Sequence, residues 1–310
     1  MERKSKILIT GITGFIAPHI ASELVKRNFE VYGLIRYVTG RRLETPNVIQ
    51  VFGDLRETHM INSILKNIMP DYVIHLGALS AVSESYDHYN EYMDINLQGT
   101  INLAEGCLRL VPNLKQFLFA STSETYGNQE SFPIKETAKL RPNSPYAVSK
   151  AGATMYLEYM WEAYNFPVTL CVPFNTYGRS DNRHFVTERI LTQMLSGQDE
   201  IRLGDPDPIR DLLYRDDHVE AYLSVLDNDE AIGEKFNFCT GKGYSIEELV
   251  HECAQATGWE GEVVWHTIPA RPLDIDTLIG SNEKAGKYLG WHPKVALGEG
   301  LRKTIDNLKQ

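Results

Sequence analysis

Tyr146 and Lys150, four residues apart, open a long stretch in which apolar residues recur at helical spacing. On a helix this spacing puts both side chains on one face. An ammonium group beside a phenol favours the phenolate, which lowers the pKa of the tyrosine toward the range useful for proton transfer. An exposed helix pair would show the same spacing, so the pair indicates catalysis only together with other polar groups.

Such groups occur at Ser121–Gly127, directly after an apolar run typical of a buried strand. Ligands of an open parallel sheet bind at the carboxyl ends of its strands, where a core would not place hydroxyls and a carboxylate. Thr122 can hydrogen-bond a hydroxyl group that is being oxidised, and Glu124 can act as a general acid/base near the same substrate ring. The predicted catalytic residues are Thr122, Ser123, Glu124, Tyr146 and Lys150.

A glycine turn, Gly11-Ile12-Thr13-Gly14-Phe15-Ile16-Ala17, separates the first predicted strand from the first predicted helix. Backbone amides and a helix N-terminus at such a turn can hold a pyrophosphate. A tight turn also needs glycine for steric reasons alone. Its place at the start of an alternating strand and helix pattern favours the dinucleotide site, lined by Gly11, Thr13, Gly14, Phe15 and Ile16.

The second predicted strand leads into Arg36, with Arg41 and Arg42 close behind, where an NAD-binding domain normally presents a carboxylate. A cation there suits a 2′-phosphate, so NADP is the predicted cofactor and NAD the second choice; a solvated loop is the alternative for these arginines. Asp54 is placed against the adenine by position, although it could equally cap the next helix. Leu55, after the third strand, and Leu76, at the end of the fourth, complete the predicted cofactor set together with Tyr146 and Lys150.

These side chains need a scaffold, and the 310-residue chain with 43% hydrophobic residues suits two closely joined domains. Apolar runs predict strands, and helical spacing predicts helices between them. The strands are Lys6–Thr10, Glu30–Ile35, Val48–Phe52, Tyr72–Leu76, Phe117–Ser121 and Val168–Val172, and the helices are Phe15–Arg27, Glu57–Ile68, Tyr89–Leu110 and Tyr146–Tyr164. This alternation predicts an α/β fold with a doubly wound, mainly parallel sheet.

The alternation becomes irregular after Phe174. We therefore predict an NADP-binding Rossmann domain over 1–174, rejoined by about 212–240, and a second, smaller, discontinuous domain over 175–310, for which the family resemblance given below implies nucleotide-sugar binding. His75, at a strand end under the cofactor, is interpreted as structural.

The composition limits the classes of binding partner and the cellular compartment that we expect. The formal net charge of −10 argues against nucleic acid or a membrane surface as partner. The cysteines lie far apart, without metal-ligand spacing, which predicts buried thiols in a reducing compartment and no metal site; they are Cys107, Cys171, Cys239 and Cys253. No signal peptide or membrane anchor is visible, so a soluble, cytoplasmic protein is expected.

At these motifs the sequence resembles the extended short-chain dehydrogenase/reductase family, and within it the GDP-mannose 4,6-dehydratases. The resemblance runs nearly end to end through Thr-Gly-x-x-Gly-Phe-Ile, Ser-Thr-Ser-Glu-x-Tyr-Gly, Pro142 to Lys150, Phe174-Asn175, Phe185-Val186-Thr187, Arg210-Asp211, and Arg271-Pro272 to Trp291. It implies that Tyr146 removes the C4 hydroxyl proton while hydride passes to NADP⁺. Glu124 then takes the C5 proton and assists loss of water from C6. Ser123 stands where thymidine-sugar dehydratases have Asp, which favours the guanosine branch.

The resemblance also implies how the substrate is held and how the chain assembles. Asn175 and Arg210 approach the diphosphate, Arg271 does so from the far side, and Val186 lies near the base. A homodimer through Tyr89–Leu110 and Tyr146–Tyr164 is expected. The segment Tyr37–Pro46 lacks the serine-rich run of many GDP-mannose dehydratases, and the stretch Pro173–Arg183 also departs from theirs.

Three other functions compete with the dehydratase. A GDP-4-keto-6-deoxymannose reductase shares the fold and the Tyr/Lys pair, but those reductases have Ser-Ser-Gly-Asp/Glu in place of Ser-Thr-Ser-Glu. A 4-epimerase needs no acid/base at Glu124. A non-catalytic NADP-binding sensor would not need Tyr146, Lys150, Thr122 and Glu124 together.

Overall fold

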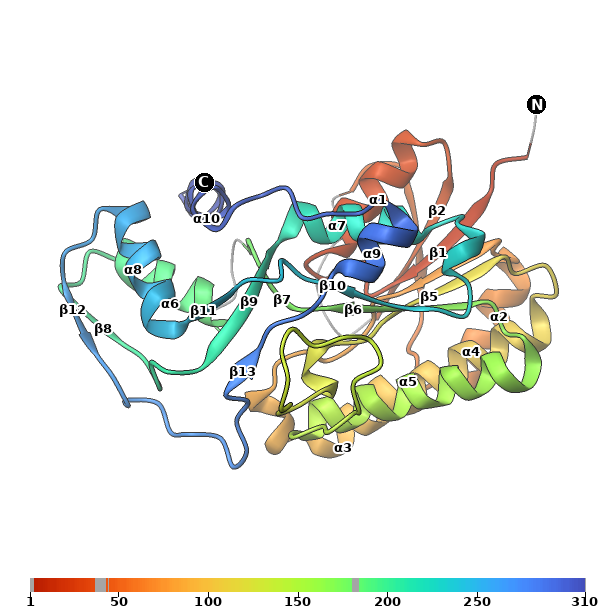
Figure 1. The fold of residues 1–310 in the computed structure, drawn as a ribbon. Coiled ribbons are helices and arrows are strands. Elements are labelled where there is room, and N and C mark those ends of the chain that lie inside the picture. Colours follow the sequence, from red (N-terminus) through yellow and green to blue (C-terminus); the bar gives the residue numbers. More distant parts are fainter. Residues whose placement is uncertain (1–2, 37–42, 44, 180–183, 310) are drawn as a thin grey trace. The chain divides into compact units, whose positions relative to one another are not determined.

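The computed structural model describes residues 3–36, 43, 45–179 and 184–309 (Figure 1). The chain divides into two compact units, each built from three separate segments. Unit 1 is Met1–Thr122, Ser144–Val172 and Ala221–Phe236, and unit 2 is Ser123–Asn143, Pro173–Glu220 and Asn237–Gln310.

A seven-stranded sheet forms the centre of unit 1, in the order β10-β6-β5-β4-β1-β2-β3. Its neighbours from β6 to β3 all pair in parallel. The strands are β1 (Lys6–Thr10), β2 (Glu30–Ile35), β3 (Val48–Phe52), β4 (Tyr72–His75), β5 (Gln116–Ala120), β6 (Val168–Pro173) and β10 (Lys235–Phe238). The order reverses direction between β1 and β4, which is the switch point where doubly wound sheets bind ligands.

Helices cover both faces of this sheet, α1 on one side and α4 and α5 on the other (Figure 1). They are α1 (Ala17–Lys26), α2 (Thr58–Ile68), α3 (Tyr89–Tyr92), α4 (Gly99–Leu110) and α5 (Pro145–Tyr164), with short turns η2 (Ser83–Tyr86) and η5 (Asp229–Ala231). Helix α2 shows why: Ile61, Ile64, Leu65 and Ile68 recur at helical spacing and enter one apolar core with α4, α5 and the sheet. Each such side chain contributes about 1.5–3 kcal/mol when fully buried.

Unit 2 has two small sheets. Strand β9 (Ile209–Tyr214) pairs with β7 (Asn175–Tyr177), β11 (Gly243–Ser245) and β13 (Thr277–Leu278), while β8 (Glu200–Arg202) pairs with β12 (Glu262–Val264). The helices are α6 (Val186–Leu195), α8 (Ile246–Thr257), α9 (Glu283–Leu289) and α10 (Leu297–Leu308), and α7 (Arg215–Val225) continues into unit 1. Buried residues of α6, α8, α10 and β9 form its core.

The predicted α/β fold with a doubly wound parallel sheet is confirmed. Two details differ. The predicted helix Tyr89–Leu110 is interrupted by a π-helical turn, η3 (Met93–Gln98), and residues 123–143 group with unit 2 because Ile134 pairs there with Gly280. The four cysteines are buried and unpaired, as predicted. No helix in the described part of the chain is long and apolar enough to cross a membrane.

Candidate functional site

One edge of the unit 1 sheet gathers the residues that the sequence assigns to the cofactor. Because β1 to β5 run parallel, their carboxyl ends meet at this edge, where Thr10 of β1 pairs with His75 of β4. Ligands of doubly wound sheets bind there. The predicted residues follow these strand ends: Gly11, Thr13, Gly14, Phe15 and Ile16 after β1, Arg36 after β2, Asp54 and Leu55 after β3, Leu76 after β4, and Thr122 after β5.

The glycine turn after β1 is packed so closely against backbone atoms that neither glycine has room for a side chain. Gly11 has a left-handed φ of +69°, and a Cβ there would lie 2.8 Å from backbone atoms of Leu76 and Gly77. A Cβ on Gly14 would lie 2.9 Å from the carbonyl oxygen of Gly11. Helix α1 begins directly afterwards, and its N-cap residue, Ile16, makes no side-chain cap. A glycine turn leading to an uncapped helix N-terminus fits the pyrophosphate of a nicotinamide dinucleotide.

Asp54 is held by an arginine that the sequence analysis did not assign. Its Oδ1 accepts hydrogen bonds from the backbone N–H and the Nε of Arg56 at 3.0 Å each, and its Oδ2 accepts one from Nη2 at 2.7 Å. This contact with Arg56, with a smaller contribution from the charge of Arg36, lowers the pKa of Asp54. The N-cap of α2 is Glu57, so the alternative in which Asp54 caps that helix is wrong.

Two features of the sequence fall outside the described residues. Arg41 and Arg42, the arginines that follow Arg36, are not among them, and neither is most of the segment Tyr37–Pro46. The same holds for residues 180–183 at the end of the divergent stretch after β6. Arg36 itself is described.

Tyr146 lies in the first turn of α5. Ser144 caps this helix, its Oγ accepting a hydrogen bond from a backbone N–H of the first turn at 3.1 Å, and Pro145 occupies the first helical position. Tyr146 is only 8% exposed, and its ring packs edge-on against Tyr92 with 6.2 Å between the centroids. The helix start therefore fixes where the phenol lies.

Lys150 follows one helical turn later and is buried. Its Nζ lies 4.1 Å from the centroid of the Phe119 ring. Burial lowers the pKa of Lys150 to about 7, because a buried ammonium group loses its hydration. A lysine with this pKa can hold or release a proton near neutral pH, and in its charged form it favours the phenolate of Tyr146.

A chain of directed hydrogen bonds fixes His75 beneath this edge. Thr10 Oγ1 accepts from Gly77 N–H at 2.9 Å and lies 2.6 Å from His75 Nδ1. Thr100 donates to the carbonyl oxygen of Asn96 at 2.6 Å and thus can only accept from His75 Nε2, 2.9 Å away. His75 therefore carries a hydrogen on Nε2, and because burial lowers its pKa the ring is neutral and Nδ1 accepts from Thr10. The structure supports the interpretation of His75 as structural.

We expect acid to destabilise the protein through His75. Burial and the nearby charge of Lys150 lower the pKa of His75 to about 3, whereas a free imidazole titrates near pH 6.5. Between these values the unfolded chain binds a proton that the folded chain does not. The free energy of unfolding therefore falls as the pH drops through this window, by up to about 1.4 kcal/mol per pH unit for this residue.

Urea unfolding of wild type and His75→Gln at pH 7 and pH 5 measures this contribution. The variant should lose less stability between the two pH values than the wild type loses. His59→Gln, a change at an exposed position, serves as the control and should keep the wild-type pH dependence. An unchanged dependence in His75→Gln would contradict the prediction.

Glu124 lies in unit 2, within the short turn η4 (Ser123–Thr125). Its neighbour Ser123 is 2% exposed, and Glu124 itself is 8% exposed. Burial raises the pKa of Glu124, although the charges of Arg210 and Arg271 oppose this effect. A buried carboxyl group with a raised pKa can take up and return a proton, as general acid/base catalysis requires.

Arg210 and Asn175 lie on neighbouring strands of unit 2. Asn175 pairs with Leu212, two residues beyond Arg210, so both polar side chains lie on the same face of the sheet. The Oδ1 of Asn175 is buried and has no hydrogen-bond partner among the described residues. Asp211 anchors the strand by accepting hydrogen bonds from the backbone N–H groups of residues 240 and 241, at 2.7 and 2.8 Å. Val186, the first residue of α6, also belongs to this unit.

Two charged residues of unit 2 were missed by the sequence analysis. Asp274 Oδ1 lies 3.3 Å from Nη2 of Arg210 and 3.7 Å from Nη1 of Arg271. Arg189 of α6 is close enough to Arg271 for that charge, after burial, to lower the pKa of Arg189. The position of Asp274, three residues after Arg271, is a weak sequence signal; no pattern marks Arg189.

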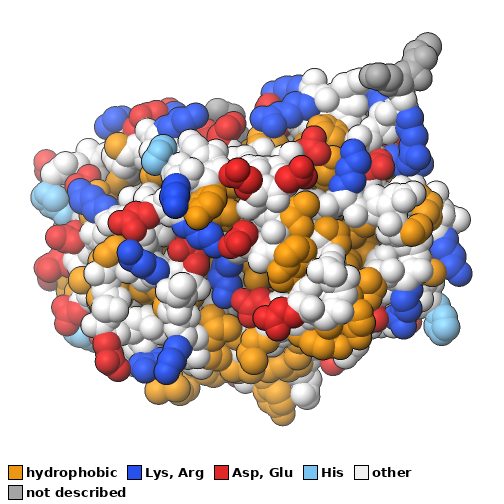
Figure 2. All heavy atoms as spheres, turned by 45° about the vertical axis from the view of Figure 1, so that its right-hand side comes forward, with side chains coloured by type: hydrophobic (Ala, Val, Ile, Leu, Met, Phe, Trp, Pro, Cys, Tyr) orange, Lys and Arg blue, Asp and Glu red, His pale blue; other side chains and the backbone are white. Residues whose placement is uncertain are grey.

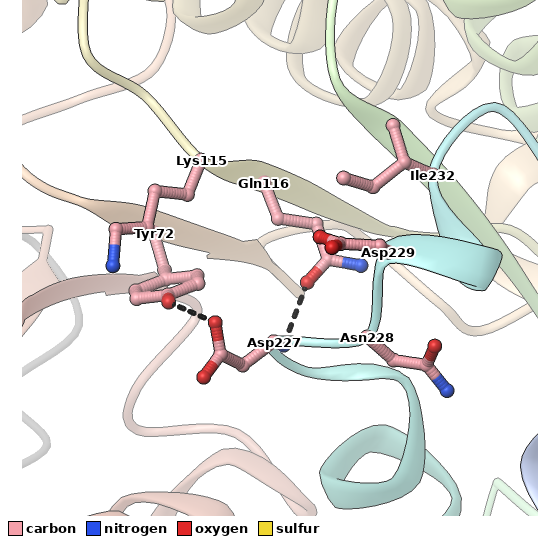
Figure 3. Close-up of a pocket in the computed structure, with 7 residues that line it drawn as sticks. All are labelled: Tyr72, Lys115, Gln116, Asp227, Asn228, Asp229 and Ile232. Carbon is pink, nitrogen blue, oxygen red and sulfur yellow. Dashed lines mark hydrogen bonds between the residues drawn. The ribbon is translucent and has the colours of Figure 1, made fainter.

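A hollow of about 380 Å³ in unit 1 is a structural junction (Figure 3). It lies at the amino ends of β4 and β5, away from the candidate residues. Tyr72 donates a hydrogen bond to the carboxylate of Asp227, and the N–H of Asp227 donates to Gln116 Oε1 at 2.9 Å. These hydrogen bonds pair the polar groups of the hollow with one another. They attach the loop after α7 to the first residues of β4 and β5.

Comparison with known proteins gives a family and a set of similar folds. A family model described as GDP-mannose 4,6 dehydratase matches residues 8–304. The GDP-mannose 4,6 dehydratase of Homo sapiens is 32% identical, over 96% of this chain and 90% of that protein.

Two solved structures resemble the chain over nearly its full length. UDP-glucose 4-epimerase of Thermotoga maritima, solved with UDP-glucose, has a TM-score of 0.91 at 31% identity and covers 98% of both chains. UDP-glucose 4-epimerase of Thermus thermophilus, a complex with NAD, has a TM-score of 0.89 at 30% identity and covers 98% of this chain and 99% of that one. Dehydratases and epimerases thus share this fold, and only their sites can separate the two activities.

Proposed function

Because this chain belongs to the GDP-mannose 4,6-dehydratase family, we propose that it is an NADP-dependent nucleotide-sugar 4,6-dehydratase that converts GDP-mannose into GDP-4-keto-6-deoxymannose. The observation that carries the proposal is Glu124, a buried carboxyl group whose pKa is raised by burial. Removing water across C5 and C6 requires a group that takes up and returns a proton. Oxidation at C4 alone would require only the tyrosine.

Tyr146 is the base of the first step in this proposal. Its phenolate takes the proton of the C4 hydroxyl group, while Thr122 holds that hydroxyl by a hydrogen bond. Lys150, one helical turn away, favours the phenolate. A nicotinamide dinucleotide held at the glycine turn after β1 would supply the hydride acceptor for C4 and the hydride donor for C6. C4 becomes a ketone and thereby acidifies the proton on C5.

Glu124 then carries out the elimination. Its carboxylate takes the C5 proton, the C5–C6 double bond forms, and the C6 hydroxyl group leaves with the proton from Glu124 as water. When the hydride is returned to C6, C5 takes up a proton from solvent and Tyr146 releases to solvent the proton that it took, so the protons balance. One water is lost and no net oxidation occurs.

The nucleotide diphosphate is assigned to unit 2. Arg210 and Arg271 supply planar guanidinium groups that can bind phosphate oxygens in pairs. Asn175, on the same sheet face as Arg210, has an unused buried acceptor. Val186 is placed near the base by family resemblance alone.

The cofactor is inferred to be NADP because Arg36 directly follows β2, where a cation suits a 2′-phosphate. The neighbouring Thermus thermophilus structure holds NAD, so NAD is the competing cofactor. Titration of the wild-type protein with both dinucleotides should give the lower Kd for NADP. A lower Kd for NAD would reverse the assignment.

A 4-epimerase is the second candidate, favoured by the 31% identity and the TM-score of 0.91 to the Thermotoga maritima enzyme. An epimerase oxidises and reduces C4 and leaves C6 unchanged, so Glu124 would have no proton to transfer.

The deciding experiment supplies purified protein with GDP-mannose and a catalytic amount of NADP⁺. We expect a 4-keto-6-deoxy product, seen by NMR as a new C6 methyl group, without accumulation of NADPH. A C4 epimer without the methyl group would establish the epimerase, and stoichiometric NADPH consumption with a keto-sugar would establish the reductase. UDP-, CDP- and dTDP-sugars run in parallel identify the base.

A homodimer is inferred from an apolar stripe on α5. Val148, Met155 and Tyr159 recur at helical spacing and are 44%, 60% and 48% exposed. In Figure 2 hydrophobic side chains gather at the bottom of the view. In Figure 1 helices α3 and α5 also lie at the bottom. Large exposed apolar patches mark interaction sites, and a second copy of the same helix would cover this one.

Met155→Lys is expected to shift the dimer toward the monomer, because it places a charge within the apolar contact. Light scattering after size-exclusion chromatography measures the mass. Met60→Lys, the same change at a 38% exposed position on α2, should leave the dimer intact. If the wild-type protein elutes as a monomer, the inference that the α5 stripe forms a dimer interface is wrong.

The four buried, unpaired cysteines suit a reducing compartment. We therefore infer a cytoplasmic location. Fractionation of cells that express the chain tests it.

A further inference from the structure

Arg56 binds the carboxylate group of Asp54, the residue to which the sequence analysis assigns the adenine of the cofactor. We propose that Arg56 is a positioning residue, which fixes Asp54 as a hydrogen-bond acceptor and thereby makes the dinucleotide site select a 6-amino purine. In this role Arg56 acts through Asp54. The proposal rests on the proposed function in one respect, that a nicotinamide dinucleotide binds at this edge of the sheet.

The guanidinium group of Arg56 contacts both oxygens of Asp54. Nε donates to Oδ1 at 3.0 Å and Nη2 donates to Oδ2 at 2.7 Å, while the backbone N–H of Arg56 gives Oδ1 a second hydrogen bond at 3.0 Å. Such a bidentate contact fixes the plane of a carboxylate as well as its position. The Asp54 side chain is therefore oriented before any ligand binds.

This contact leaves Asp54 one acceptor position. An ionised carboxylate has two lone pairs on each oxygen, and Oδ1 uses both of them on Arg56. Within the part of the chain that the structure describes, Oδ2 accepts only the hydrogen bond from Nη2, so one lone pair of Oδ2 remains. The Asp54 side chain is 18% exposed, which restricts the directions from which a ligand can reach that lone pair.

Arg56 also keeps Asp54 in its ionised form. The hydrogen bond from the Arg56 side chain makes the largest contribution to lowering the pKa of Asp54. Arg56 itself stays charged, because the hydrogen bond to Asp54 and the charges of Asp54, Glu91 and Asp94 raise its pKa. An ionised carboxylate has no hydrogen to donate. Asp54 can therefore accept a hydrogen from a 6-amino group but cannot donate one to a 6-oxo group.

The backbone around this pair is anchored without the Arg56 side chain. Asn102 of α4 donates from Nδ2 to the carbonyl oxygen of Leu55 at 2.9 Å, and the N–H of Glu57 donates to the carbonyl oxygen of Asp54 at 3.0 Å. Leu55 is 8% exposed and packs in the core of unit 1. Removing the guanidinium group should thus free the Asp54 carboxylate and leave its backbone in place.

The group at position 6 of the purine provides the readout. Adenine carries an amino group there, whereas hypoxanthine carries an oxygen, which would face the open acceptor of Asp54. A hydrogen bond to a charged group corresponds to about ten- to a hundredfold in Kd, and a site built to accept a hydrogen rejects an analogue that cannot donate one. We expect the wild type to bind an adenine dinucleotide more tightly than its hypoxanthine analogue by this factor.

Calorimetric titration with NADP⁺ and NAD⁺, each beside its hypoxanthine analogue, tests the proposal. The ratio of the two Kd values in a pair is the adenine preference. Arg56→Met keeps the apolar stem and removes the guanidinium group, so adenine must order a free carboxylate, which can also turn away from a 6-oxo group. The adenine preference should fall about three- to tenfold, the usual effect of ordering one side chain on binding. Hypoxanthine also carries a hydrogen on N1, so the change between proteins, and not the wild-type preference alone, measures the role of Arg56.

Arg202→Met is the matched control. Arg202 also pairs with a carboxylate two residues before it, donating from Nε to Glu200 Oε1 at 2.8 Å, but it lies in unit 2 and is exposed. This variant should keep the wild-type adenine preference. Asp54→Asn can present an amide hydrogen to the purine and should lose more of the preference than Arg56→Met loses.

An unchanged preference in Arg56→Met, or an equal loss of affinity for both members of a pair, would overturn the proposal and make Arg56 a structural residue of the turn before α2. A wild type without preference, or an Asp54→Asn protein that keeps it, would overturn it as well, because Asp54 would then not contact the purine at position 6. A wild type that binds none of the four dinucleotides would reject the proposed function and this proposal with it. The expected preferences without dehydration of any nucleotide sugar would leave the role of Arg56 in place and reject the proposed function instead.

Discussion

Tyr146→Phe is expected to lower kcat by about two to four orders of magnitude, the usual contribution of a positioned acid/base group. The variant keeps the ring that packs against Tyr92 at 6.2 Å and loses only the oxygen that is proposed to take the C4 proton. Binding of the dinucleotide should persist, because the glycine turn and α1 remain unchanged. Product formation followed by NMR, together with a titration of the cofactor, separates the two effects.

Tyr92→Phe is the matched control for this loss. Tyr92 is 1% exposed, its hydroxyl donates to the carbonyl oxygen of Ala81 at 2.6 Å, and its ring is the one that packs on Tyr146. Removing this hydrogen bond should cost about 1 kcal/mol of stability and little activity. A Tyr146→Phe protein with turnover close to wild type would exclude the phenol as the base.

Glu124→Gln is expected to stop the loss of water while oxidation at C4 continues. The amide cannot take the C5 proton, so a loss of about 10² to 10⁴ in overall turnover follows. The hydride then cannot be returned to C6, and the near-ultraviolet absorbance of reduced nicotinamide should appear on mixing with substrate. A single-turnover experiment with excess enzyme measures this absorbance.

Stability provides the internal control for Glu124→Gln. Burial raises the pKa of Glu124 in the folded state, so the stability that this group contributes is present below its unfolded pKa and is lost as the pH rises. At neutral pH the neutral amide should therefore melt no lower than wild type. Glu130→Gln, an exchange of the same kind at an exposed residue, should leave turnover unchanged. Full turnover by Glu124→Gln would remove this residue from the mechanism.

The fold was predictable because its signals are local. In β1 and β2 short apolar runs mark strands that are buried, and in α2 the residues Ile61, Ile64, Leu65 and Ile68 mark the buried face. The π-helical turn Met93–Gln98 was not predictable, since its cause lies in tertiary contacts. Within it, Asn96 exchanges hydrogen bonds with both backbone groups of Leu79, at 2.8 and 3.0 Å.

The candidate site also has one part that local sequence patterns predict and one part that they do not. The cofactor edge was visible because Gly11, Arg36 and Thr122 each follow a strand within two residues, and parallel strands bring such positions together. The charge cluster of unit 2 joins Glu124 to residues 86 and 150 positions further along the chain, Arg210 and Asp274. No local pattern predicts contacts at that range, and only the family resemblance indicated the two arginines.

The strand order of unit 1 has a consequence for biosynthesis. Strand β10, which pairs with β6 at one end of the sheet, begins at Lys235, so the ribosome must have made most of the 310 residues before that edge can close. Until then β6 presents apolar side chains and unpaired backbone groups, the features through which nascent chains aggregate. A fragment that ends near Phe174 would carry the same open edge permanently. We therefore expect the sheet to complete its folding late in translation. Until then the exposed strand β6 is where a chaperone would be needed.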